Sequence, residues 1–187
     1  MHRIPAAFAI AAASLLLAAC STIAPTPEMA VVAVRPGPSP LNVAEKAFVV
    51  KAINKTLYEL EVSKIAAVRA SDPRVRAYAE GMVSRQAQFT DVLVKLMADK
   101  GVAPPKALPA DKATKLHKLA SLPPSAAFDQ GYVRVVGIED HQANISLLEQ
   151  GRRIAVDRDL KAFIERSLPT LRRQLSVAQE LAGSISG

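Results

Sequence analysis

The chain has 187 residues, of which 50% are hydrophobic, 4% aromatic and 22% charged. Its 24 lysines and arginines outnumber 17 acidic residues, which gives a formal net charge of +7. A single cysteine excludes a disulfide-stabilised scaffold and a zinc module held by several cysteines, the hydrophobic content excludes a largely disordered chain, and the length predicts one folded domain.

The first predicted element is a signal peptide in residues 1–19. After a short basic start, residues 4–19 are apolar except for Pro5 and Ser14. This run is shorter than the ~20 residues that span a bilayer as a helix. A basic start, a short apolar stretch and small residues at its end are typical of a secretory signal. The sequence therefore predicts export.

Residues 17–21, Leu-Ala-Ala-Cys-Ser, resemble a bacterial lipoprotein lipobox. The resemblance implies cleavage before Cys20, diacylation of its thiol and further acylation, with palmitate as a typical chain, of the new amino group. Two or more acyl chains hold a protein stably at a membrane. An Asp after the cysteine favours the inner membrane in such lipoproteins, so Ser21 predicts the outer membrane. We expect a lipid-anchored envelope protein that faces the periplasm, and export excludes nucleic acid as a partner.

Residues 20–41 are predicted to form a tether between the lipid and the domain. This segment contains Pro25, Pro27, Pro36, Pro38 and Pro40. Proline removes a helical hydrogen-bond donor and favours extended backbone. The tether is therefore expected to be semi-extended.

Residues 42–183 are predicted to form a four-helix domain, and the first two helices have clear end signals. Asn42 and Glu45 have the spacing of a capping box, which opens a helix that runs to about residue 70. Asp72 and Pro73 suit the cap and the first position of a second helix. Gly101 is placed to end that helix near residue 100.

The third helix is predicted over residues 125–155, and the fourth runs from a cap at Asp157 to about residue 182. Pro169 lies inside the fourth helix and is expected to kink it. The sequence of Asp157–Glu165, DRDLKAFIE, resembles that of Asp72–Glu80, DPRVRAYAE. This similarity between the starts of the second and fourth helices indicates a duplicated hairpin.

The lengths of the connections predict the topology. Short turns join helices one and two and helices three and four, which makes two antiparallel hairpins. Residues 102–124 are rich in proline and long enough to run the length of a bundle, with a short helix over 111–120. No stretch alternates like a strand. The prediction is an all-α, ferritin-like four-helix bundle of two hairpins joined by a long crossover.

Each predicted helix carries one polar residue near the middle of its inward stripe: Glu59, Gln86, His141 and Gln174. Glu149 lies on an adjacent row of the third helix. A buried polar group costs ~1–3 kcal/mol unless it is hydrogen-bonded. These five residues are therefore the candidates for a polar centre, which is either a structural network or a binding site.

A di-metal carboxylate centre would need a Glu from each of two helices and a Glu-x-x-His from each of the other two. Of the 3 histidines, His2 lies in the predicted signal and His117 in the crossover. Ile138, not a Glu, stands three residues before His141. We therefore expect no cofactor, no metal and no enzymatic activity. The alternative is a metal-dependent oxidoreductase or metal-storage protein with a degenerate site.

Five segments recur in the order of a known family. They are YELEVSKIA from Tyr58, VRAYAEGMV from Val75, FDQGY from Phe128, EDHQ from Glu139 and SLPTLRRQL from Ser167. Together they resemble the ferritin-like domain-of-unknown-function family of bacterial envelope proteins, over residues 44–181. The resemblance implies a ferritin-like fold and an envelope location, but that family has no agreed molecular function.

That family usually carries Asp-His where this chain has Arg85-Gln86, and His where this chain has Gln174. Only Glu59, His141 and Glu149 match its polar pattern, and they would be the ligands in the metal-dependent alternative. Glutamine can maintain a hydrogen-bond network but is a poor ligand for iron or zinc. The departures favour a structural network.

We predict a non-catalytic binding or structural module of the envelope. The basic residues are spread along the helix faces, so an envelope protein or an acidic polymer is a candidate partner besides the membrane. A small ligand seated in the polar centre is a further candidate. The sequence leaves the oligomeric state open.

Overall fold

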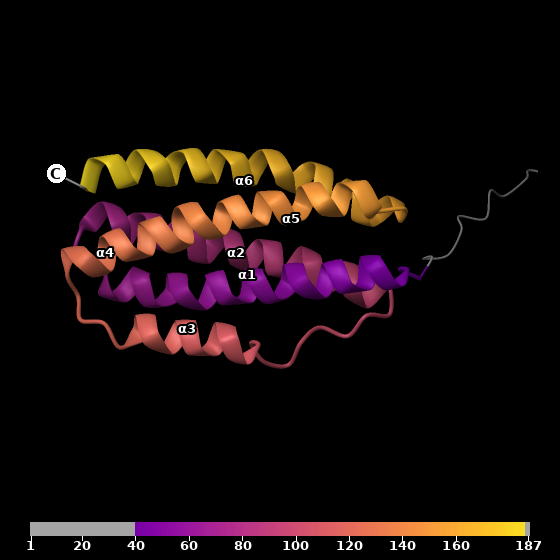
Figure 1. Ribbon diagram of the computed structural model, residues 1–187, viewed down its shortest axis with the longest axis horizontal. Coiled ribbons are helices and arrows are strands. Elements are labelled where there is room, and N and C mark those ends of the chain that lie inside the picture. The colour runs from indigo at the N-terminus through magenta and orange to yellow at the C-terminus, as the bar shows by residue number, and fades with distance from the viewer. Residues whose placement is uncertain (1–39, 186–187) are drawn as a thin grey trace, which may run out of the picture. The chain divides into compact units, whose positions relative to one another are not determined.

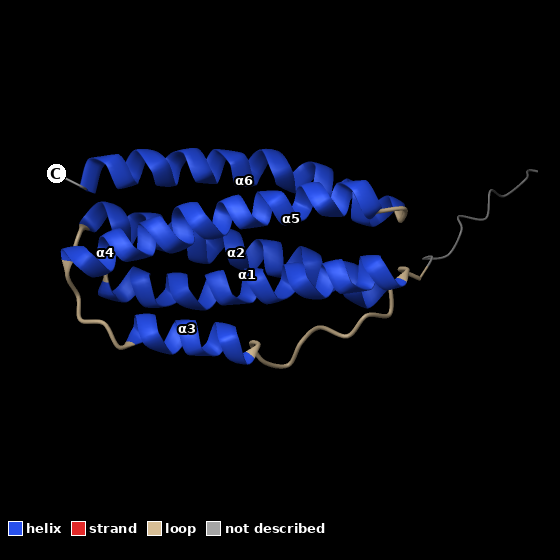
Figure 2. Ribbon diagram, in the orientation of Figure 1, coloured by secondary structure: helices blue, strands red, loops and turns tan. Residues whose placement is uncertain are grey.

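The computed structural model describes residues 40–185 (Figure 1), and every regular element in this range is a helix (Figure 2), which confirms the all-α prediction. The predicted signal, Cys20 and the tether up to residue 39 lie outside the described residues. None of the helices between residues 40 and 185 combines the length and the hydrophobicity that crossing a bilayer requires.

The first antiparallel hairpin consists of α1, Val43–Arg69, and α2, Pro73–Asp99. The capping box is present: the N–H of Asn42 donates to Oε2 of Glu45, and the N–H of Glu45 donates to Oδ1 of Asn42, both at 2.9 Å. Gly101 follows α2 with a φ of 67°, a left-handed conformation that favours glycine. The predicted ends of both helices are therefore confirmed.

The second hairpin pairs a composite helix with α6. The composite helix consists of α4 (Ala126–Tyr132), the π-helical segment η1 (Val133–Asp140) and α5 (His141–Ile154), and α6 spans Arg158–Ile185. The segments follow one another as one rod beside α6 (Figure 1). Helix α6 continues through Pro169.

The crossover runs along the first hairpin and contains α3, Ala110–Ala120, close to the predicted position. Helix α3 lies beside α1 (Figure 1). The ammonium group of Lys112 lies 4.6 Å from the centre of the Tyr58 ring, a cation–π contact. Arg69 donates a hydrogen bond to the carbonyl oxygen of Ala120. These contacts fix the crossover on the outer side of α1.

The π-helical segment corrects the predicted inward face of the third helix. A π-turn contains more residues than an α-turn, so it displaces the inward positions from those that a 3.6-residue period predicts. Ile138 and Ile145, three residues before and four residues after the inward His141, would lie inward in a regular helix but are only half-buried. Val136 and Asn144 are buried instead, at 1% and 7% exposure.

The buried side chains form two apolar clusters with polar positions between them along the helices. One cluster includes Phe48, Leu93, Met97, Leu160 and Ile164. The other includes Val62, Met82, Phe128, Tyr132 and Val136. Along α1 the polar side chain of Glu59 lies between residues of the two clusters, as Gln86 does along α2. The bundle thus places a polar layer between two apolar cores.

Candidate functional site

Glu59 is the centre of the buried polar layer. It is 1% exposed, and α1 directs it toward α2 and α5. Nε2 of Gln86 donates to its Oε2 at 2.6 Å, and Nδ2 of Asn144 donates to its Oε1 at 2.5 Å. One carboxyl group therefore joins three helices.

The pKa of Glu59 is raised to about 8, chiefly by burial and then by the nearby charge of Asp140, although the cation of Lys55 acts in the opposite direction. At pH 7 the carboxyl group is therefore mainly protonated. A protonated carboxyl group donates its O–H, so one neighbouring amide must present its oxygen.

His141 forms the second pair of the polar layer, with Gln174 of α6. Its Nδ1 lies 2.9 Å from the carbonyl oxygen of Val136, which can only accept, so Nδ1 carries a proton. Burial lowers the pKa of His141. The ring is therefore neutral at pH 7, and Nε2 is an acceptor. Nε2 lies 3.1 Å from the amide of Gln174, which must turn its N–H toward the ring.

The layer extends toward α4 through two tyrosines. The hydroxyl of Tyr132 donates to Oγ of Ser63 at 2.9 Å, and the rings of Tyr78 and Tyr132 meet edge to face at 6.2 Å. A Cβ at Gly137 would lie 3.2 Å from the Tyr78 hydroxyl and 2.9 Å from Cβ of Ala178. Gly137 therefore permits the close packing of η1 against α2 and α6.

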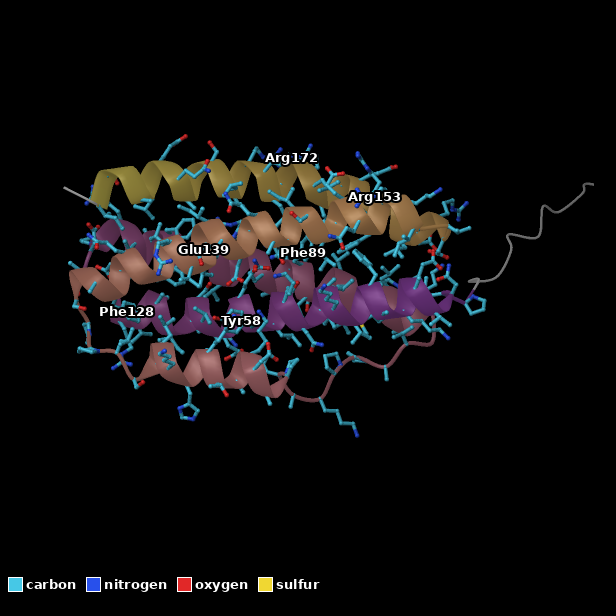
Figure 3. The ribbon with its side chains drawn as sticks, viewed as in Figure 1. Tyr58, Phe89, Phe128, Glu139, Arg153 and Arg172 are labelled. Carbon is cyan, nitrogen blue, oxygen red and sulfur yellow. The ribbon has the colours of Figure 1, made fainter. Side chains whose placement is uncertain are left out.

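The prediction that Glu149 belongs to the polar centre is wrong. Its Oε1 lies 2.5 Å from a guanidinium nitrogen of Arg172, and its Oε2 lies 2.8 Å from one of Arg152. Its side chain is 22% exposed. Asn144, three residues after His141 in the regular helix α5, lies on the inward face, and the row that contains Glu149 does not. Glu149 therefore belongs to a surface ion-pair cluster with Arg152 and Arg172. Arg172 is labelled in Figure 3.

The other four predicted residues form two pairs, Glu59 with Gln86 and His141 with Gln174. Asn144 was not predicted, although its position three residues after His141 places it on the same helical face. That spacing is the signal that would have identified it. The described residues contain no group of three His, Cys, Asp or Glu side chains arranged to hold a metal ion.

An open pocket with a volume of about 260 Å³ lies between α2 and α6. Gln86 and Gln174 form part of its wall, and their amides also contact Glu59 and His141. Phe89 of α2 (Figure 3) and Phe163 of α6 also line it, with ring centres 5.1 Å apart. The pocket is therefore adjacent to the polar layer, and two glutamines separate them.

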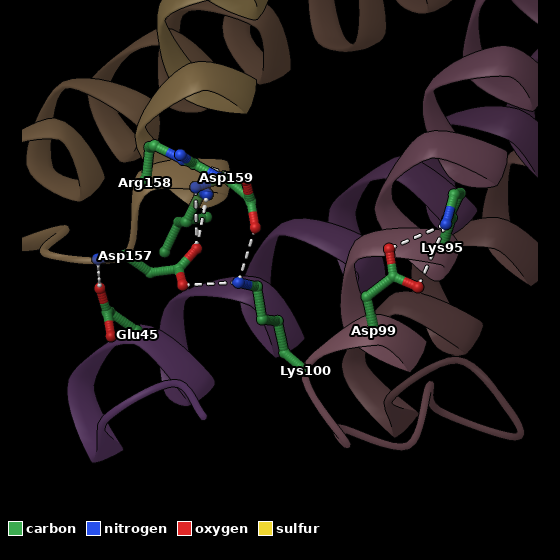
Figure 4. A network of polar contacts seen from close by, with 8 residues as sticks. Glu45, Lys95, Asp99, Lys100, Asp157, Arg158 and Asp159 are labelled. Atoms are coloured by element: carbon green, nitrogen blue, oxygen red, sulfur yellow. Dashed lines mark hydrogen bonds and ion pairs between the residues drawn. The ribbon is translucent and has the colours of Figure 1, made fainter. Parts of the chain in front are cut away.

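A second polar cluster, remote in sequence from the Glu59 network, joins the two hairpins. Nζ of Lys100 lies 2.6 Å from Asp157 and 2.8 Å from Asp159 (Figure 4). The side chains of Lys100 and Asp157 are only 2% and 7% exposed. The ammonium group thus connects the end of α2 to the start of α6, and both of its ion pairs stabilise the packing of the two hairpins.

Comparison with known proteins places the chain in a family. Residues 32–181 match the family model described as a domain of unknown function, DUF4142. The fold is similar to that in the crystal structure of a DUF305 fragment from Deinococcus radiodurans, with a TM-score of 0.67 and 15% sequence identity over 78% of this chain and 99% of that chain. At this identity the likeness concerns the fold alone. No curated protein matches the chain.

Proposed function

The chain belongs to the DUF4142 family, whose function is unknown, and we propose that it is a lipid-anchored envelope protein that faces the periplasm and acts as a non-catalytic binding module. The anchoring rests on the lipobox-like residues 17–21 and on the proline-rich segment that follows them. Ser21 after the cysteine favours the outer membrane. The bundle then lies at the end of a tether, on the periplasmic side.

The pocket between α2 and α6 is the observation that carries the binding role. Its wall combines arginines, glutamines, hydroxyl groups and apolar side chains, and contains no Cys, His, Asp or Glu. Those four residue types supply most general bases and covalent nucleophiles. The hydroxyl of Ser167, also on the wall, donates to the carbonyl oxygen of Phe163 at 2.7 Å. The pocket therefore offers recognition groups without an evident catalytic pair.

The anchoring is tested by metabolic labelling with palmitate followed by cell fractionation. The wild-type protein is expected to carry the label and to fractionate with the outer membrane. Cys20→Ser should lose both properties, and Ser21→Asp should keep the label but shift toward the inner membrane. Membrane retention of the unlabelled Cys20→Ser protein would contradict the proposal.

The non-catalytic, metal-independent role is tested by elemental analysis of the Cys20→Ser protein after incubation with iron, manganese or zinc and removal of free ions. We expect no stoichiometric metal. Tight binding that disappears in His141→Ala, but not in the control His117→Ala, would overturn the proposal in favour of a metal-dependent protein. His117 is the suitable control because it is exposed on α3.

A further inference from the structure

We propose that the pocket between α2 and α6 binds a small amphiphilic anion, a carboxylate that carries an aromatic ring or a short acyl chain. This inference rests on the proposed function, because it names the ligand class of the binding module. The pocket walls combine cationic donors with an apolar surface, and each of these two features selects one part of the ligand.

Two arginines supply the cationic part, Arg85 from α2 and Arg166 from α6. Within residues 40–185, neither guanidinium group lies in an ion pair with a carboxylate, and the wall itself contains no acidic side chain. Nε of Arg85 is buried without a hydrogen-bond partner. A guanidinium group offers several donors in the planar geometry that a carboxylate matches. The walls therefore favour an anion and disfavour a cation.

Gly81 determines where the head of Arg85 lies. A Cβ built at Gly81 would be 2.8 Å from Nη1 of Arg85 and 3.3 Å from Cζ. The guanidinium group therefore lies against the backbone of α2, one helical turn before its own residue. An alanine at position 81 would displace this group without removing its charge.

The apolar part of the ligand is expected to contact Phe89, Phe163, Val92 and Leu171 on the same wall. The volume of about 260 Å³ exceeds the ~150 Å³ cavity that accommodates benzene in a protein core. The space thus suits one ring or a short chain together with a carboxylate. Gln88 and Thr170 add neutral hydrogen-bonding groups to the wall.

Isothermal titration of the full-length Cys20→Ser chain with three ligands of equal chain length, octanoate, octanol and octylamine, tests the ligand class. Octanoate is expected to bind one site, and the other two to bind at least ~10-fold more weakly, as the loss of a hydrogen bond to a charged group implies. Equal binding of octanol and octanoate, or tighter binding of octylamine, would overturn the assignment.

Three variants test the location of the site. Arg85→Gln and Arg166→Gln should each weaken octanoate binding ~10-fold or more, and Gly81→Ala should weaken it although every charge is kept. Arg153→Gln is the control, because it removes the same charge from an exposed position of α5 outside the pocket. Unchanged octanoate binding in both arginine variants would overturn the proposal. Arg166 is exposed, so its variant is informative even if Arg85→Gln fails to fold.

Flotation with lipid vesicles separates a free carboxylate from an anionic lipid headgroup. We expect the Cys20→Ser chain to bind octanoate but to float equally poorly with anionic and zwitterionic vesicles. A chain that does not bind octanoate, and that floats only with anionic vesicles in a manner dependent on Arg85 and Arg166, would overturn the ligand class. The proposed function as an anchored binding module would still stand. Loss of Cys20-dependent anchoring in cells would instead contradict the proposed function itself.

Discussion

The carboxylate of Glu45, in the first turn of α1, accepts a hydrogen bond from the backbone N–H of Asp157, just before α6, at a distance of 2.8 Å. The same oxygen accepts from the N–H of Val156 at 2.7 Å. An acidic side chain at the start of the first hairpin therefore holds the turn of the second hairpin.

The second hairpin makes an equivalent contact with the turn of the first hairpin. Asp129, in the first turn of α4, accepts from the backbone N–H groups of Ser71 and Asp72 at 3.0 and 2.7 Å. The first helix of each hairpin thus supplies one carboxylate to the turn of the other. This reciprocity agrees with the similarity between Asp72–Glu80 and Asp157–Glu165, which predicts a duplicated hairpin.

Replacing either carboxylate should destabilise the bundle by similar amounts. Glu45→Ala leaves three N–H groups without their carboxylate partner, and Asp129→Ala leaves two. We expect each variant to lower the free energy of unfolding by about 2 kcal/mol or more. Urea denaturation at pH 7 measures this. Asp111→Ala, at an exposed position in the first turn of α3, is the control. A loss no larger than in this control would contradict the interpretation.

The contribution of Glu45 should also depend on pH. Burial raises its pKa, but the hydrogen bonds from the N–H groups of Asp157, Asn42 and Val156 outweigh this effect and lower the pKa below the ordinary 4.5. The stabilisation is therefore complete above pH 4.5 and is lost as the pH falls through the lowered pKa. The difference in unfolding free energy between wild type and Glu45→Ala should shrink at pH 3.

Glu59→Gln should stabilise the protein at neutral and alkaline pH. The pKa of Glu59 is raised from 4.5 to about 8 in the fold. This group therefore does not reduce the free energy of unfolding below pH 4.5, and reduces it progressively as the pH rises toward 8. A glutamine carries no charge and can still both donate and accept. We expect a gain of roughly 3 kcal/mol at pH 7, seen as a flatter pH profile of unfolding free energy.

The control for this variant is Glu61→Gln, on the same helix. Glu61 is partly exposed and pairs with Lys64 at the surface, where an ion pair contributes ~0–1 kcal/mol. Its pH profile should follow that of the wild type. If the Glu59→Gln profile also matched that of the wild type, the buried carboxyl group would not be the source of the pH dependence of the unfolding free energy.

Gly151→Ala should destabilise the contact between α5 and α1. A Cβ at this position would lie 2.3 Å from Cε2 of Phe48, so the aromatic ring or the helix must move, at a cost of about 1–3 kcal/mol. Gly131→Ala is the matched control, because a Cβ there meets nothing within 4 Å and alanine favours a helix by ~1 kcal/mol. The melting temperature should therefore fall in Gly151→Ala and rise in Gly131→Ala.

Lys100→Met should destabilise the junction of the hairpins by about 3 kcal/mol, because it leaves Asp157 buried without its cation. Lys95→Met is the control: Lys95 pairs with Asp99 near the same end of α2 (Figure 4), but the two side chains are 76% and 51% exposed. We expect a loss of under ~1 kcal/mol for the control. Equal losses in chemical denaturation would contradict a special role for Lys100.

The four long helices, their caps and the crossover were predictable because each depends on neighbours in the chain. The Asn42–Glu45 capping box, Pro73 at the start of α2 and Gly101 after its end are local signals. The spacing of inward polar residues likewise identified Glu59 and Gln86. Burial of both is confirmed, at 1% and 4% exposure.

The composition of the polar layer and of the pocket depended on the tertiary structure. A regular helical period cannot anticipate the π-helical segment Val133–Asp140. The packing of the hairpins decides which polar residue of α5 reaches Glu59: Asn144 lies beside it, whereas Glu149 pairs with surface arginines. Arg85 and Arg166 lie 81 positions apart in the printed sequence and line one pocket only because two separate hairpins pack together. The sequence by itself determined the helices, through local hydrogen bonding and periodicity; packing between the hairpins decided which side chains meet.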